Sequence, residues 1–104
     1  MIKQQIKEKK VEEIKKILKT NKAILSNKFK VKEIGVFGSM VRGEEVDGSD
    51  VDVLVEFYET ISLLDFVALE NSICELIGRK VDLVMKSALK PRIGRHILKE
   101  VAYI

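Results

Sequence analysis

The segment VFGSMVRGE at residues 36–44 is followed, after four residues, by the segment SDVDVLVEF at residues 49–57. In the second segment two sets of side chains alternate, and this period of two predicts a strand over residues 50–57. One face of that strand carries Asp50, Asp52, Leu54 and Glu56, and the other carries Val51, Val53, Val55 and Phe57. Residues 31–37 are mainly apolar and predict a preceding strand, which Gly38-Ser39 ends. We therefore expect two consecutive strands joined by a short connection.

The residues on either side of these strands predict helices. Apolar residues recur at helical spacing from Ile2 to Leu25. A second helix is expected between Ser62, which suits an N-cap, and Gly78, which suits the position just after a helix. Pro91 suits the first turn of a last helix.

A third strand is predicted at KVDLVM, residues 80–85, which gives the element order αβ(α)βαβα. This order predicts a single α/β domain over residues 1–104, with a small three-stranded mixed sheet and helices packed on it. Its parts would be an N-terminal helix at 1–28, a core at 31–85 and a C-terminal helix at 86–104.

The composition is typical of one globular domain, because 46% of the 104 residues are hydrophobic and 34% are charged. The single Cys cannot form an internal disulfide. No run of about 18 apolar residues is present, and the first residues lack the apolar segment of a signal peptide. We therefore expect a cytoplasmic protein with no membrane association.

Charge is distributed unevenly along the chain: residues 1–30 carry a net +7, residues 31–85 a net −8 and residues 86–104 a net +4. An acidic middle argues against a uniform nucleic-acid-binding face. It predicts a carboxylate-rich centre that attracts metal cations. The basic residues near the end, which include Lys90, Arg92 and Arg95, would face either an acidic partner or the phosphates of a nucleotide.

The predicted topology brings three aspartates to one end of the sheet. Asp50 and Asp52 open the second strand beside the end of the first, if those two strands are antiparallel. The second and third strands are joined through a helix, which requires a parallel crossover and places Asp82 beside the other two.

Three such carboxylates repel one another strongly. Two of them about 4 Å apart repel by about 4 kcal/mol at an effective dielectric near 20, and a small domain is stable by only roughly 5–15 kcal/mol. Either the groups take up protons or a hard divalent cation bridges them. Mg²⁺, which prefers one or two carboxylates together with phosphate oxygens and water, suits this arrangement.

Gly38-Ser39 would supply the phosphate-binding half of such a site. A glycine lets the backbone approach a phosphate closely. Backbone N–H groups of the following turn, with the Ser39 hydroxyl, can donate to phosphate oxygens. Arg42, one turn later, adds a cation. This layout is typical of phosphoryl or nucleotidyl transfer.

Together these residues resemble the signature of the DNA polymerase β-type nucleotidyltransferase superfamily, in which a hydrophobic residue and Gly-Ser precede an Asp-x-Asp pair between apolar residues. More narrowly, the chain resembles the minimal nucleotidyltransferase (MNT) domains, the antitoxins of HEPN/MNT toxin–antitoxin pairs. RKVDLV at residues 79–84 and ALKPR at residues 88–92 add to this likeness, which covers residues 31–104.

The resemblance implies a nucleotidyltransferase fold and transfer of AMP from ATP to a tyrosine of a HEPN ribonuclease toxin, which silences the toxin. It implies that Asp50 and Asp52 bind two Mg²⁺ ions and that Asp82 completes the metal site and helps to activate the attacking oxygen. Gly38 and Ser39 would hold the triphosphate. No direct nucleic-acid partner is expected.

Several alternatives stay open at this point. Arg42 would contact phosphate or pair with Glu44 or Asp47, and Ser39 could cap the turn that follows it. The chain could also be a non-catalytic antitoxin that masks its partner, or a transferase acting on a small molecule such as an aminoglycoside.

Overall fold

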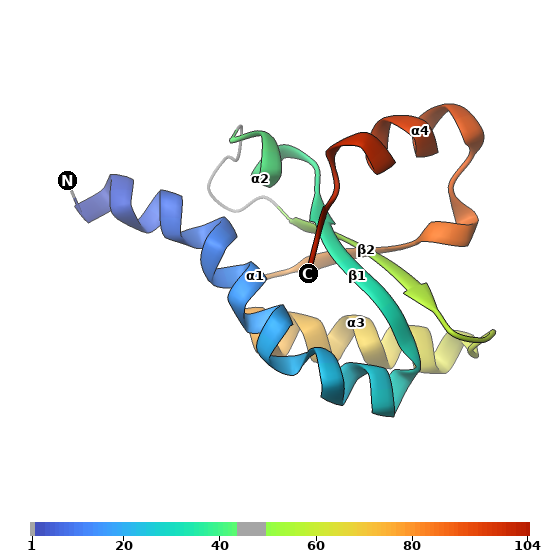
Figure 1. Cartoon of the computed structure of the whole chain (residues 1–104). Helices are drawn as coiled ribbons and strands as arrows, with labels where there is room; N and C mark the ends of the chain where they lie inside the picture. Colours follow the sequence, from blue (N-terminus) through green and yellow to red (C-terminus); the bar gives the residue numbers. More distant parts are fainter. Residues whose placement is uncertain (1, 44–49) are drawn as a thin grey trace.

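The computed structural model describes residues 2–43 and 50–104, and it places the side chains of residues 11–43 and 50–104 (Figure 1). In order, the elements are α1 (Ile2–Phe29), β1 (Val31–Phe37), α2 (Ser39–Arg42), β2 (Val51–Phe57), α3 (Leu63–Ile77), β3 (Val81–Met85), the 3-10 helix η1 (Lys86–Ala88), α4 (Pro91–Glu100) and β4 (Ala102–Tyr103). Every helix and strand predicted from the sequence is present, but the C-terminal helix is shorter than the predicted range 86–104, because Pro91 begins it and β4 follows it. The polar loop at residues 44–49 lies outside the described residues.

The sheet has four strands in the order β3-β2-β1-β4. β1 pairs with β2 antiparallel, and β2 pairs with β3 parallel, as the crossover through α3 required. The expected number of three strands was wrong, because β4 adds a short antiparallel pairing to β1, in which Gly35 lies opposite Tyr103 and Val36 opposite Ala102. A strand of two residues is too short to show a period of two, so the sequence pattern could not predict it.

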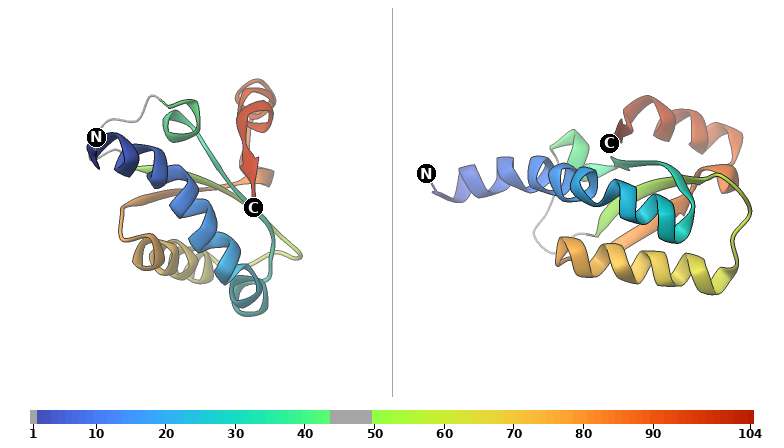
Figure 2. Two further views of the ribbon diagram at one scale, coloured as in Figure 1. Left: turned by 60° about the vertical axis from the view of Figure 1, so that its left-hand side comes forward. Right: turned by 60° about the horizontal axis from the view of Figure 1, so that its bottom comes forward.

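The helices lie on both sides of the sheet. α1 and α3 lie side by side on one face, and α4 lies on the opposite side (Figures 1 and 2). The predicted alternation of β2 is confirmed, because Val51, Val53 and Val55 are fully buried in the core beneath α1 and α3. Asp52, Leu54 and Glu56 therefore belong to the face that α4 covers.

The ends of α3 are fixed by the predicted residues. The Ser62 side chain accepts a hydrogen bond from the N–H of Asp65, and Gly78 takes the left-handed conformation just after the helix. α3 is the crossover between the parallel strands β2 and β3. In the described part of the chain, no helix is long and apolar enough to cross a membrane.

Candidate active site

Two of the three predicted aspartates lie at neighbouring positions of the sheet. In the parallel pairing Asp52 is opposite Asp82, and in the antiparallel pairing it is opposite Phe37, the last residue of β1. Asp50 immediately precedes β2. Asp52 is half-buried, whereas Asp50 and Asp82 are exposed. The structure therefore brings the Asp-x-Asp pair, the third aspartate and the Gly-Ser segment to one end of the sheet, as the topology predicted.

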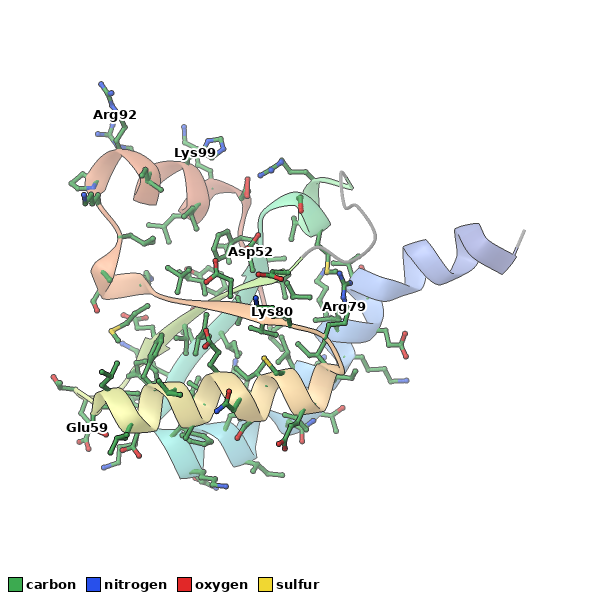
Figure 3. All side chains as sticks on the ribbon, turned by 180° about the vertical axis from the view of Figure 1, so that it is seen from behind. Asp52, Glu59, Arg79, Lys80, Arg92 and Lys99 are labelled. Carbon is green, nitrogen blue, oxygen red and sulfur yellow. The ribbon has the colours of Figure 1, made fainter. Side chains whose placement is uncertain are left out.

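The environment of Asp52 is unfavourable for a negative charge. Burial raises the pKa of its carboxyl group, the carboxylates of Asp82, Asp50 and Glu100 raise it further, and the Arg42 guanidinium offsets part of this rise. The negative charges of these carboxylates therefore interact, as expected from their predicted proximity. Figure 3 shows Asp52 between the sheet and α4, on the side away from α3.

The three carboxylates do not form a closed cage. Among the residues that the structure describes, no group of three or more His, Cys, Asp or Glu side chains is close enough to hold a metal ion. Adjacent carboxylates on β2 and β3 still fit Mg²⁺, which takes one or two protein carboxylates and fills its remaining positions with phosphate oxygens and water. The roles of Asp50, Asp52 and Asp82 as metal ligands stay a prediction.

Gly38 can only be a glycine at this position. Its backbone has φ 83° and ψ −156°, a region that other residues essentially never adopt. A Cβ at Gly38 would also overlap the Oδ2 atom of Asp52 and lie 3.0 Å from its Cγ. The backbone of the Gly-Ser segment thus packs directly against the Asp52 carboxylate.

Ser39 is the first residue of α2, and the N-cap position belongs to Gly38 rather than to Ser39. The carbonyl oxygen of Gly38 accepts hydrogen bonds from the N–H groups of Val41 and Arg42, at 3.1 and 3.2 Å. The tight turn therefore starts at Gly38, and it brings Ser39 and Arg42 to the same end of the sheet as the aspartates. The alternative in which Ser39 caps this turn is not what the structure shows.

Arg42 has an acidic partner, Glu100, that the sequence did not predict for it. Arg42 Nη1 lies 2.8 and 2.9 Å from the two carboxylate oxygens of Glu100. The two partners expected from the sequence, Glu44 and Asp47, lie outside the described residues. The alternative of a phosphate contact by Arg42 is untested and stays a prediction.

Glu100 is a site residue that the sequence did not predict. Its Oε2 accepts a hydrogen bond of 2.8 Å from the N–H of Gly38, and only 15% of its side chain is exposed. Burial pushes the pKa of Glu100 upward, but the Gly38 hydrogen bond and the Arg42 guanidinium outweigh it, so that the pKa is lowered. One signal was present in the sequence: Glu100 is the only acidic residue in residues 86–104.

Comparison with known proteins identifies the family. Residues 11–104 match the family described as nucleotidyltransferase domain. The chain belongs to this family. The match spans all the strands, so the carboxylates and the Gly-Ser segment of this nucleotidyltransferase lie within it.

Named relatives are similar along nearly their whole length. The chain is 53% identical over 94 residues to the protein adenylyltransferase MntA of Thermococcus cleftensis, covering 90% of this chain and 95% of that protein. It is 48% identical over 97 residues to a candidate protein adenylyltransferase of Methanocaldococcus jannaschii, covering 92% of this chain and 99% of that protein.

Solved structures share the fold. A candidate minimal nucleotidyltransferase superposes with a TM-score of 0.70 at 33% identity, covering 86% of this chain and 93% of that chain. A toxin–antitoxin crystallised with AMP-PNP gives a TM-score of 0.66 at 21% identity, covering 78% and 66% of the two chains. An MNT antitoxin in complex with a tri-AMPylated HEPN toxin of Shewanella oneidensis gives a TM-score of 0.58 at 18% identity. The superposition covers 93% of this chain and 70% of that chain.

Proposed function

We propose that this nucleotidyltransferase transfers AMP from ATP to a tyrosine hydroxyl of a HEPN-type ribonuclease toxin and so acts as its antitoxin in the cytoplasm. The observation that carries the proposal is the pairing of Asp52 with Asp82 at the end of the sheet where the Gly38 turn also lies. The identity with MntA of Thermococcus cleftensis supports a protein acceptor. The fold likeness to antitoxins crystallised with AMP-PNP or with an AMPylated HEPN toxin is consistent with ATP and with that partner.

In this proposal, the hydroxyl oxygen of the acceptor attacks the α-phosphorus of ATP, the bond to the bridging oxygen breaks, and pyrophosphate leaves. Asp50, Asp52 and Asp82 would hold Mg²⁺, which supplies charge neutralisation and a lowered pKa of the acceptor hydroxyl when bound. Asp82 is exposed on its strand, and in this proposal it would help to take the hydroxyl proton. Gly38, Ser39 and Arg42 would hold the triphosphate.

Transfer of radiolabel tests this directly. The chain is incubated with Mg²⁺, a purified HEPN protein encoded beside it, and ATP labelled on either the α- or the γ-phosphate. We expect the partner to be labelled from α-labelled ATP alone, with loss of labelling in Asp52→Asn and Asp82→Asn. Asp65→Asn is the matched control, because Asp65 is an exposed aspartate in the first turn of α3. Labelling from γ-labelled ATP, or full labelling by Asp52→Asn, would contradict the proposal.

Masking without catalysis is the second candidate, and exposed apolar side chains favour a contact surface. At the start of α3, Leu63 and Leu64 are 77% and 81% exposed, which is unusual for two adjacent leucines. If Asp52→Asn protects cells from the toxin as well as the wild-type chain does, masking is the mechanism. Labelling of an aminoglycoside with no partner present would favour a small-molecule acceptor.

A further inference from the structure

The short strand β4 places the last residue of α4 beside the Gly-Ser turn. β4 pairs with β1 so that Gly35 lies opposite Tyr103 and Val36 opposite Ala102. Continued by two positions in the same antiparallel register, this pairing sets Glu100 opposite Gly38. The pairing is close, because a Cβ at Gly35 would lie 2.7 Å from Val101 Cγ2 and 3.0 Å from the carbonyl oxygen of Ala102. The position of Glu100 is therefore fixed by the backbone and not by a flexible tail.

Glu100 uses its two carboxylate oxygens on two different parts of the predicted phosphate-binding segment. One oxygen accepts from the N–H of Gly38, at 2.8 Å, and both accept from Arg42 Nη1, at 2.8 and 2.9 Å. Charge-assisted hydrogen bonds of this length are the stronger kind. The Glu100 side chain is 15% exposed and the Arg42 side chain 42%, so the Gly38 hydrogen bond is the better shielded of these contacts, and water screens the ion pair with Arg42 in part. Glu100 thus joins the start and the end of the turn that carries Ser39.

Arg42 interacts with two carboxylates: that of Asp52, which is expected to bind metal, and that of Glu100. It is close enough to Asp52 to act on its charge, yet the hydrogen bonds of its Nη1 go to Glu100. Loss of Glu100 would remove the carboxylate that holds this guanidinium beside the Gly-Ser turn.

We infer that Glu100 is a positioning residue for nucleotidyl transfer: it fixes the Gly38 backbone and holds the Arg42 guanidinium at the predicted phosphate-binding turn. The inference rests on the proposed function and deepens it. In this role Glu100 acts through Gly38 and Arg42, the residues that its carboxylate contacts. The basic side chains on the far side of α4, such as Arg92 and Lys99, point away from the sheet and take no part in this contact (Figure 3).

The test compares Glu100→Gln and Glu100→Ala with the wild-type chain. Glutamine keeps the length and one oxygen acceptor for the Gly38 N–H but loses the charge that holds Arg42, whereas alanine loses both. We expect kcat for AMP transfer to fall by about tenfold in Glu100→Gln and about a hundredfold in Glu100→Ala, because misplaced catalytic groups cost about this much. Glu75→Gln is the matched control, since Glu75 is an exposed glutamate on α3, across the sheet.

Two further readouts separate positioning from a merely structural role. Calorimetric binding of Mg²⁺ with AMP-PNP needs no acceptor protein, and we expect weaker binding in Glu100→Ala. In an Arg42→Ala background, Glu100→Ala should cost much less than in the wild-type background, because part of its effect passes through Arg42.

Wild-type binding and kcat in Glu100→Ala would overturn the inference while leaving the proposed function intact. The inference would also be overturned if Glu100→Ala lowered AMP transfer by the same factor in the wild-type and the Arg42→Ala backgrounds. A wild-type chain that binds no nucleotide would overturn the proposed function and this role together.

Discussion

Replacing Gly38 with alanine tests the packing of the Gly-Ser turn against Asp52. The backbone at Gly38, with φ 83° and ψ −156°, costs a residue with a Cβ about 1–3 kcal/mol. The new Cβ would also overlap Asp52 Oδ2, so the carboxylate must turn away, at about 0.5–1.5 kcal/mol for a displaced rotamer. The expected loss in the free energy of unfolding is therefore about 1.5–4.5 kcal/mol.

Gly78→Ala is the matched control for this substitution. Gly78 also has a positive φ, of 75°, but a Cβ there would meet nothing within 4 Å. A left-handed backbone alone costs about 1–2 kcal/mol, and the entropy that alanine removes from the unfolded chain is the same at both positions. Urea unfolding should therefore show Gly38→Ala to be less stable than Gly78→Ala by about 1–2 kcal/mol.

Activity should separate the two variants further. A carboxylate displaced by about 1 Å can lower a catalysed rate by about a hundredfold, so Gly38→Ala should lose AMP transfer under conditions in which it is still folded. Gly78→Ala should keep the wild-type rate under the same conditions. If Gly38→Ala matches Gly78→Ala in stability and retains transfer, Asp52 does not depend on Gly38 and the reasoning is refuted.

Two more predictions concern Asp52 and β4. The pKa of Asp52 is raised above 3.8 in the folded chain. Between 3.8 and the raised pKa, the folded state therefore binds a proton that the unfolded state has released. This proton binding stabilises the folded state, and the stabilisation is lost as pH rises through the raised pKa. Without metal, Asp52→Asn should therefore be more stable than wild type at neutral pH, and the difference should shrink on acidification in urea titrations; an unchanged difference would contradict the sign. Gly35→Ala would press on Val101, 2.7 Å away, costing about 1–3 kcal/mol. By displacing β4 it should also lower AMP transfer as Glu100→Ala does, and full transfer would show that β4 does not position Glu100.

The sequence was sufficient for the parts of the fold whose signals are local. The alternating residues of β2, the N-cap Ser62 and the terminal Gly78 each predicted their element, and the crossover rule then predicted that β3 is parallel to β2. The adjacency of Asp52 and Asp82 follows from these steps.

Glu100, which the sequence did not predict as a site residue, reaches the site through a contact between distant parts of the chain. Glu100 reaches Gly38 because β4 pairs with β1, and two residues cannot display a strand period. The local pattern instead directed attention to Glu44 and Asp47 as partners of Arg42, since both are close to it in sequence. The available clue was that Glu100 is the only acidic residue in an otherwise basic segment.

Calorimetric titration of Mg²⁺ into the chain with AMP-PNP tests most directly whether the aspartates form a metal site for nucleotide. The wild-type chain and Asp65→Asn should take up the cation with the nucleotide, and Asp52→Asn and Asp82→Asn should lose most of this uptake. Undiminished uptake in Asp52→Asn and Asp82→Asn would contradict the assignment of these carboxylates to the metal.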